Sequence, residues 1–161
     1  QSPVTNPQHR RQAMTLAEKK FHQKSAVVDW MTQTPTTIAG DARLIEAYNL
    51  MKENEFRRLP VVKRNGELVG IITMSDIHQH VPFFPEDPEI EVDLPLMTTT
   101  VQEIMSWDPE TISPNATIQE AAELMLDAQV SGLPVVEHDR VVGIITESDI
   151  FRLVIESWSN D

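Results

Sequence analysis

The strongest constraint on the fold is an internal repeat, because the same blocks of sequence occur twice in the same order. VVDWMTQTPTTI (27–38) aligns with VQEIMSWDPETI (101–112), and DARLIEAYNLM (41–51) aligns with NATIQEAAELM (115–125), both at an offset of 74. LPVV recurs at 59–62 and 133–136, and GIITMSD (70–76) then matches GIITESD (143–149) at an offset of 73. Such ordered self-similarity is the signature of duplicated structural units. We therefore expect one unit at 25–81 and a second at 101–156.

Each unit is predicted to follow the order β-α-β-β-α, after a short initial helix. Asp41 and Asn115 are predicted N-caps of helices whose apolar residues recur at helical spacing. The LPVV, LVGIIT and VVGIIT runs are predicted strands, and Asn65-Gly66 is typical of a hairpin turn. Thr73 and Thr146 are predicted to begin the final helices. One such unit leaves a sheet face uncovered, so we expect an α+β fold in which two units pack through their sheets by pseudo-twofold symmetry.

Three segments lie outside the repeats. Residues 1–24 hold five basic residues and one acid, which predicts a basic helical extension with a net charge of +4. Residues 82–100 hold four prolines, five acids and no basic residue, so they are predicted to form a Pro/acid-rich surface linker. Residues 157–161 are predicted to be a C-terminal tail. We expect the linker to contact apolar surface through Phe83, Phe84, Leu94 and Leu96.

The composition argues against several classes of function. The whole chain carries a net charge of −12, so the part beyond residue 24 carries −16 and repels phosphate backbones, and we expect no nucleic-acid binding. The chain has no cysteine, which rules out disulfides and thiolate metal sites and suits a reducing, cytoplasmic compartment. No apolar run approaches the roughly 18 residues of a membrane span, so we expect no membrane contact within this chain.

Catalytic and metal-binding motifs are absent from the sequence. It contains no GxSxG, HExxH, GxxxxGK[ST] or GxGxxG pattern. His78 and His80 lie two positions apart on a predicted helix, so their side chains diverge and make a poor metal pair. We interpret them as exposed histidines near a helix end. The sequence therefore predicts no catalytic residue, no metal site and no enzyme.

The pairs Thr73/Asp76 and Thr146/Asp149 have two interpretations. A threonine N-cap followed by an acid three residues later is a common helix start, and the cap alone explains the pattern. The same geometry leaves backbone N–H groups at a helix N-terminus, where phosphate and hydroxyl groups bind. The carboxylate can accept hydrogen bonds from two sugar hydroxyls, while Thr and Ser can donate to ribose or phosphate oxygens.

At this point the sequence resembles the tandem cystathionine-β-synthase (CBS) domains that form a Bateman module. Those domains carry V-x-x-x-M-[ST], a T-[IV] strand, an LPVV-type strand and G-h-h-[ST]-x-x-D, where h is apolar, and all four occur here twice in order. The resemblance covers about 27–155. It implies a regulatory module that binds AMP, ADP, ATP or S-adenosylmethionine in two clefts between the repeats and responds by a conformational shift.

The resemblance also implies which residues line each cleft. The first cleft would use Thr36, Phe56, Arg57, Arg58, Thr146, Ser148 and Asp149. The second cleft would use Glu110, Val130, Ser131, Gly132, Thr73, Ser75 and Asp76. In this family the aspartate would hold ribose hydroxyls, Thr and Ser the sugar or phosphate, and backbone near the first strand the adenine edge.

The two clefts are not equivalent in charge. FRRLPVV has two arginines where VSGLPVV has none, and a guanidinium pairs well with phosphate. Glu110 stands where the first cleft has Thr36, which disfavours an anion in the second cleft. We therefore expect a nucleotide to occupy the cleft with Arg57, Arg58 and Asp149 first. The alternative is that both arginines are solvated or paired with the acidic surface.

Apolar residues in IFRLVIESW (150–158) exceed what one module needs to bury, and related modules dimerise through such helices. We expect a homodimer, because an exposed apolar helix face usually marks a partner. Two other functions remain open. The chain could be a ligand-free dimerisation or structural module, or a cytosolic regulatory fragment of a larger transporter or enzyme, which the start at Gln1 and the basic N-terminal stretch would fit.

Overall fold

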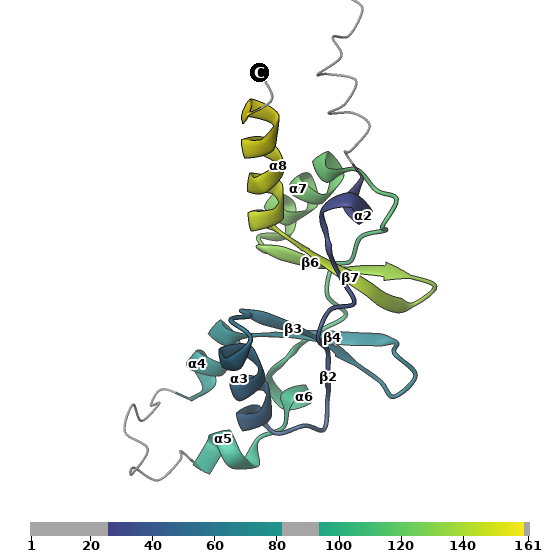
Figure 1. The fold of residues 1–161 in the computed structure, drawn as a ribbon. Helices are drawn as coiled ribbons and strands as arrows, with labels where there is room; N and C mark the ends of the chain where they lie inside the picture. The colour runs from purple at the N-terminus through teal and green to yellow at the C-terminus, as the bar shows by residue number, and fades with distance from the viewer. Residues whose placement is uncertain (1–25, 82–93, 160–161) are drawn as a thin grey trace, which may run out of the picture.

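Two units stacked with their sheets facing each other make up the molecule (Figure 1). The computed structural model describes residues 26–81 and 94–159. The predicted basic extension at 1–24 and the linker residues Phe83 and Phe84 lie outside this range. Among the helices within it, none has the length and apolarity needed to cross a bilayer.

The first unit contains a four-stranded sheet in the order β2-β3-β4-β5. β2 pairs with β3 in parallel, and the other two pairs are antiparallel. Its elements are β2 (Ile38–Ala39), α3 (Leu44–Glu53), β3 (Arg58–Val62), β4 (Leu68–Thr73), α4 (Met74–His80), α5 (Leu94–Thr98), α6 (Val101–Ile104) and β5 (Ser106–Trp107).

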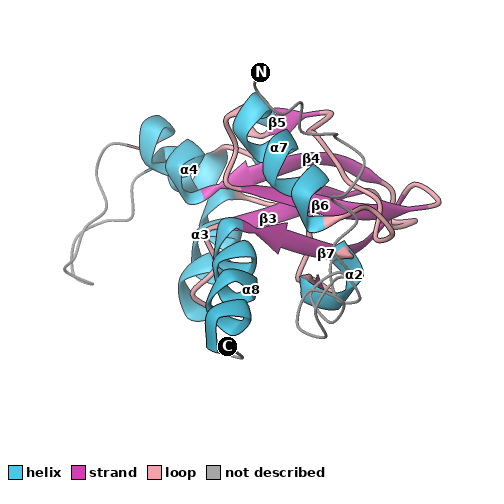
Figure 2. Ribbon diagram, turned by 90° about the horizontal axis from the view of Figure 1, so that it is seen from above, coloured by secondary structure: helices cyan, strands magenta, loops and turns pink. Residues whose placement is uncertain are grey.

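The second unit contains a three-stranded sheet in the order β1-β7-β6. A parallel bridge between Ile112 and Val135 stands where β2 pairs with β3 in the first unit, so the β-α-β-β-α order occurs twice. Seen from above, the strands of both units project onto one central region with helices around it (Figure 2). The elements are α2 (Val27–Trp30), β1 (Thr32–Gln33), α7 (Ile118–Ala128), β6 (Gly132–Glu137), β7 (Arg140–Thr146) and α8 (Glu147–Ser159).

The opening segment of each repeat packs in the other unit. α2 places Val27 in the core of the second unit, and β1 pairs with β7, with Thr32 opposite Ile144. Conversely, α6 packs in the first unit, and β5 pairs with β4, with Ser106 opposite Ile71. Figure 1 shows the chain leaving α2 in the upper unit and entering the lower unit at β2. The two units are therefore interlocked, a feature that the repeat pattern did not predict.

Two repeated glycines allow the exchanged strands to approach closely. A Cβ atom on Gly70 would lie 2.5 Å from Met105 Sδ and 2.8 Å from the carbonyl oxygen of Ser106. A Cβ on Gly143 would overlap Met31 Sδ and lie 3.0 Å from the carbonyl oxygen of Thr32. Glycine inside a strand often marks such a close approach of another backbone. The first letter of each GIIT run is thus explained by the exchanged strand that crosses it.

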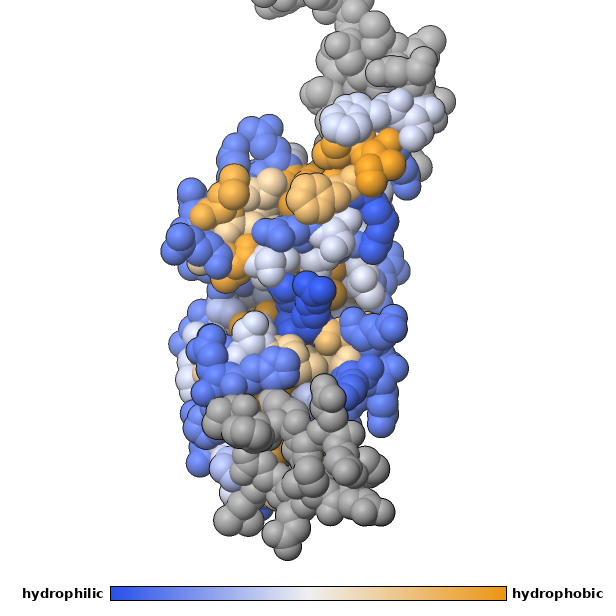
Figure 3. Space-filling model, turned by 90° about the vertical axis from the view of Figure 1, so that its left-hand side faces the viewer, coloured by the Kyte–Doolittle hydropathy of each residue, from blue (hydrophilic) through white to orange (hydrophobic). Residues whose placement is uncertain are grey.

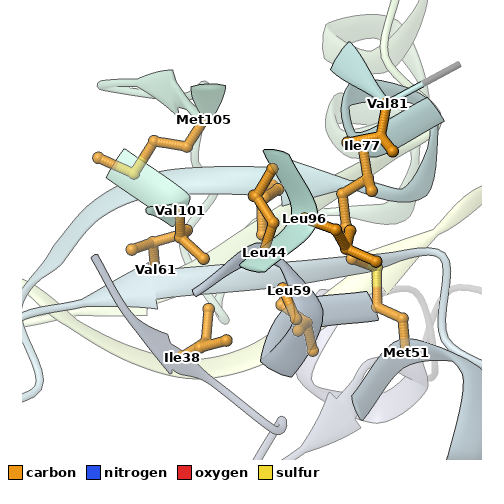
Figure 4. Packing of buried hydrophobic residues seen from close by; sticks show 12 residues of the cluster. Ile38, Leu44, Met51, Leu59, Val61, Ile77, Val81, Leu96, Val101 and Met105 are labelled. Carbon is orange, nitrogen blue, oxygen red and sulfur yellow. The ribbon is translucent and has the colours of Figure 1, made fainter. Parts of the chain in front are cut away.

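Each unit has its own hydrophobic core on the outer face of its sheet. Figure 4 shows the first core, where residues of β3 and β4 pack against helices α3 to α6. Leu96 of α5 is only 2% exposed within this core. The prediction of a surface linker is therefore wrong for α5, because the apolar side chain of Leu96 has a core to enter. α8 continues to Ser159 and so includes the first three residues of the predicted tail.

The predicted helix starts are wrong by two residues. Asp41 and Asn115 lie in turns, whereas α3 and α7 begin after Arg43 and Thr117. Thr117 Oγ1 accepts from the Glu120 N–H at 3.1 Å, and Glu120 Oε2 accepts from the Thr117 N–H at 2.7 Å. This reciprocal box satisfies two backbone donors, which one Asn cap cannot do. The hairpin turn at Asn65-Gly66 is confirmed, with Gly66 at φ +85°.

Candidate functional site

Two cavities open between the facing sheets, and each is lined by both repeats. The Asp149 cleft, of about 500 Å³, is lined by all seven residues predicted for the first cleft: Thr36, Phe56, Arg57, Arg58, Thr146, Ser148 and Asp149. The Asp76 cleft, of about 610 Å³, is lined by all seven predicted for the second: Glu110, Val130, Ser131, Gly132, Thr73, Ser75 and Asp76. Both volumes fall in the range of small-molecule sites. The structure thus brings together each predicted set.

Asp149 is a buried carboxylate, 3% exposed, at the start of α8. Its Oδ2 accepts hydrogen bonds from the backbone N–H and the Oγ1 hydroxyl of Thr146 at 2.9 and 3.0 Å. Its Oδ1 accepts from Arg152 Nη1 at 2.9 Å, in an ion pair whose arginine side chain is 66% exposed. Asp149 therefore caps the helix with Oδ2 and holds the exposed guanidinium of Arg152 with Oδ1.

Asp76 repeats the cap without the ion pair. Its Oδ2 accepts from the N–H and the hydroxyl of Thr73, both at 2.8 Å, and its own N–H donates to Thr73 Oγ1 at 3.1 Å. Gln79 occupies the position equivalent to Arg152 at the offset of 73. Among the described residues, no group donates a hydrogen bond to Asp76 Oδ1, so this oxygen can accept from a ligand.

Arg152 is a cleft residue that the sequence reasoning missed. It lines the Asp149 cleft, one helical turn after the aspartate with which it pairs. Aligning the two final helices beyond the shared aspartate, where Arg152 stands against Gln79, would have revealed the difference. The Asp149 cleft therefore has one arginine that the Asp76 cleft lacks.

The arginines of β3 do not belong to one cleft alone. Arg57 and Arg58 line both cavities, so the predicted contrast between an arginine-rich and an arginine-free cleft is wrong. The reason is position: the residue pair lies where the two repeats meet, and the long side chains border the space on both sides. In Figure 3, strongly hydrophilic side chains fill the waist between the units. The clefts differ in charge because Arg152, Glu55 and Glu147 line only the Asp149 cleft, whereas Glu110 lines only the Asp76 cleft.

Arg58 is a half-buried cation without a carboxylate partner among the described residues. Its Nη2 donates to Ser131 Oγ at 2.7 Å, a neutral acceptor on the other repeat. Burial lowers the pKa of the Arg58 guanidinium from its ordinary value, although the nearby Glu147 carboxylate acts in the opposite direction. The guanidinium stays charged at neutral pH. Removing such a charge from water is costly unless an anion approaches it.

The remaining walls combine apolar and polar surface. Phe56 and Val130 occupy equivalent positions of the two repeats, are 38% and 37% exposed, and each lines one cleft. Such exposed apolar side chains can cover the face of a flat ring.

The first N–H of each final helix already donates a hydrogen bond, because Met74 donates to the Arg57 carbonyl and Glu147 to the Ser131 carbonyl. The predicted supply of free N–H groups is therefore smaller than expected.

The two histidines of α4 are exposed, as the sequence predicted. His78 and His80 both lie on the surface of α4, and His78 also borders the Asp76 cleft. Within 26–81 and 94–159, no cluster of His, Asp and Glu is placed to hold a metal ion.

Comparison with known proteins gives the same picture of two repeats. A family model described as the CBS domain matches residues 27–82 and again 101–156. A CBS domain-containing protein of Dictyostelium discoideum is 37% identical over 136 residues, covering 83% of this chain and 93% of that protein. Homoserine O-acetyltransferase of Methanohalobium evestigatum is 33% identical over 137 residues, which cover 84% of this chain but only 25% of the enzyme.

Solved structures agree with the fold. The crystal structure of the CBS domain pair of protein MJ0100, in complex with 5′-methylthioadenosine and S-adenosyl-L-methionine, superposes with a TM-score of 0.70 at 30% identity. The match covers 82% of this chain and 97% of that one. The duplicated unit, the two clefts at its centre and these matches together place the chain in the CBS domain family, as a tandem pair of CBS domains.

Proposed function

We propose that this chain is a regulatory module that binds an adenosine ligand in its two clefts. The observation that carries the proposal is Arg58, a half-buried cation between two cavities that forms no ion pair with a described carboxylate, although Glu147 lies near it. An anionic ligand would supply the missing charge. The solved CBS pair bound to two adenosine derivatives supports the adenosine part of such a ligand. Among AMP, ADP, ATP and S-adenosylmethionine, the arginines favour the nucleotides, which carry phosphate.

Each part of the ligand has a matching group in the clefts. Asp76 Oδ1 can accept from ribose hydroxyls, and Asp149 Oδ1 can do so once Arg152 turns away. The threonine and serine hydroxyls can donate to ribose or phosphate oxygens. Phe56 and Val130 offer apolar contacts to the adenine ring. We propose that the Asp149 cleft fills first, because Arg152 adds a third guanidinium there that can turn to a phosphate. Acids line both clefts, with Glu55 and Glu147 in this one and Glu110 in the other.

The ligand would act by binding one arrangement of the two units better than another and so shifting their populations. No catalytic step is proposed. The controlled protein would be an enzyme or transporter, a class supported by the relative in which the matched region is a quarter of an acetyltransferase. A cytoplasmic setting fits this role.

We also propose that the chain forms a homodimer through α8. Phe151, Ile155 and Trp158 are 63%, 59% and 73% exposed and follow one another at i, i+4 and i+7, which puts them on one face of the helix. Figure 3 shows apolar surface gathered over the upper unit on this side of the molecule. Light scattering should give twice the chain mass, and Trp158→Glu should halve it. A monomeric mass for the parent chain at tens of micromolar would contradict the dimer.

A thermal-shift panel of AMP, ADP, ATP and S-adenosylmethionine tests the proposed ligand class. A ligand at 100 times its Kd stabilises the folded chain by about 2.7 kcal/mol. At about 2–4 °C per kcal/mol for a chain of this size, Tm should rise by about 5–11 °C. If none of the four compounds moves Tm, the clefts are empty and the chain is a ligand-free structural module.

A further inference from the structure

One half-buried guanidinium, that of Arg58, lies between the two clefts. Aligning LPVV at 59–62 with LPVV at 133–136 makes Gly132 the equivalent of Arg58 and Ser131 the equivalent of Arg57. Arg57, Arg58 and Ser131 line both cavities. Arg58 belongs to the first repeat, but its charged end lies against the second, where Nη2 donates to Ser131 Oγ at 2.7 Å. The side chain therefore crosses the line on which the two repeats meet.

The space at this crossing holds only one long side chain. A Cβ atom on Gly132 would overlap Arg58 Nη1 and would lie 3.0 Å from its Cζ and 3.2 Å from its Cδ. The volume that a second arginine would need is thus already filled by the first. The pseudo-symmetric pair of clefts consequently has a single guanidinium at its centre, held by one neutral hydroxyl rather than by a carboxylate.

We propose that the two clefts compete for Arg58, so that a phosphate-bearing ligand in one cleft weakens the binding of a second anionic ligand in the other. This inference rests on the proposed function of the clefts. A guanidinium is a planar fork that aligns with one phosphate at a time. Once Arg58 turns to a ligand in the Asp149 cleft, the Asp76 cleft loses its half-buried cation. It also gains a nearby negative charge, which repels a second anion.

The other cations near the crossing do not remove this competition. Arg57 borders both clefts, but it is exposed, so salt and water screen its charge. Arg152 lines only the Asp149 cleft, which makes that cleft the first to fill. Neutral adenosine needs no cation, so it should bind the two clefts independently. Because linkage is reciprocal, filling either cleft with AMP must weaken the other by the same factor.

Calorimetric titration of the full chain separates coupling from a simple difference between the clefts. Ser148→Trp places a bulky neutral side chain at an exposed position of the Asp149 cleft and so blocks AMP there without adding a charge near Arg58. The Asp76 cleft of this variant should bind AMP at least about tenfold more tightly than the second binding step of the parent chain. Adenosine should bind the Asp76 cleft of the parent and of this variant with the same affinity.

Two further variants test the role of Arg58 itself. Arg58→Met keeps an unbranched, flexible side chain, although a shorter one, and removes the charge, so AMP should bind the Asp76 cleft equally well whether or not the other cleft is blocked. Gly132→Ala should have the same effect by pushing the flexible end of Arg58 off the crossing. If the Asp76 cleft of Ser148→Trp bound AMP only as tightly as the second step of the parent chain, the competition would be overturned and the ligand proposal left intact. No AMP binding to any variant would overturn the proposed function and this inference with it.

Discussion

Gly70→Ala tests whether the exchanged strands lock the two units together. The added Cβ would lie 2.5 Å from Met105 Sδ and 2.8 Å from the Ser106 carbonyl oxygen, so β5 has to move away from β4. Overpacking of this kind costs about 1–3 kcal/mol. At about 2–4 °C per kcal/mol, Tm should fall by about 2–12 °C in a thermal denaturation followed by circular dichroism.

The same substitution should affect the clefts unequally. Ser106, Pro109 and Glu110 follow or belong to β5 and line the Asp76 cleft, whereas none of them lines the Asp149 cleft. Gly70→Ala should therefore weaken ligand binding in the Asp76 cleft and spare the Asp149 cleft. A variant with the parent Tm and two intact binding steps would refute the close approach as the reason for this glycine.

The matched position in the other repeat supplies a control. At Gly143 the closest atoms to an added Cβ are the side-chain atoms of Met31, and the backbone contact is longer, 3.0 Å to the Thr32 carbonyl oxygen. Shortening Met31 should therefore rescue Gly143→Ala, while shortening Met105 should not rescue Gly70→Ala, because the Ser106 oxygen remains in the way. Double-mutant cycles measure this difference. Equal rescue at both positions would contradict the distances.

Two other substitutions give independent tests. Arg152→Gln copies the residue of the first repeat and frees Asp149 Oδ1. Because the arginine end of the lost ion pair is 66% exposed, we take the pair as worth about 0.2–1 kcal/mol, so adenosine should bind the Asp149 cleft up to about fivefold more tightly by calorimetry. AMP should bind about tenfold more weakly, because the guanidinium is lost, and an unchanged AMP-to-adenosine ratio would contradict this. Leu96→Ala removes a side chain that is 2% exposed and should destabilise the chain by about 2–5 kcal/mol in urea denaturation. The same change at exposed Met97 should cost little. Equal effects at the two positions would mean that α5 lies on the surface, as its composition predicts.

The repeat was enough to predict two units of one fold, whereas the residues of both clefts were predicted from the resemblance to tandem CBS domains. Glycines, helix caps and strands recur at fixed offsets, so the two repeats are expected to share one fold. Two units of the same fold can pack against each other in only a few arrangements. The strand exchange was not predictable in this way, because Val27 and Val101 read as apolar helix residues whichever core they enter. Only the three-dimensional path of the chain assigns them to the opposite unit.

The charge of the clefts was predicted less well, for two physical reasons. Arg58 lines both cavities and its Nη2 donates to Ser131 of the other repeat, so its place in β3 could not assign it to one cleft. Arg152 lies beyond the repeated motif, one turn into α8, where attention to the motif alone passes it by. Leu96 was expected to contact apolar surface, but the proline and acid content around it predicted a surface linker rather than a helix whose leucine enters the first core.

The most direct test of the central claim is an equilibrium titration of AMP into the parent chain and into Asp149→Asn, Asp76→Asn and the double variant. Each asparagine keeps the shape of the capping side chain but replaces the carboxylate that would accept hydrogen bonds from ribose hydroxyls. The account predicts AMP binding to the parent, loss of the tighter step in Asp149→Asn, loss of the weaker step in Asp76→Asn, and no binding to the double variant. Unchanged AMP binding by the double variant would contradict the assignment of the ligand to these two clefts.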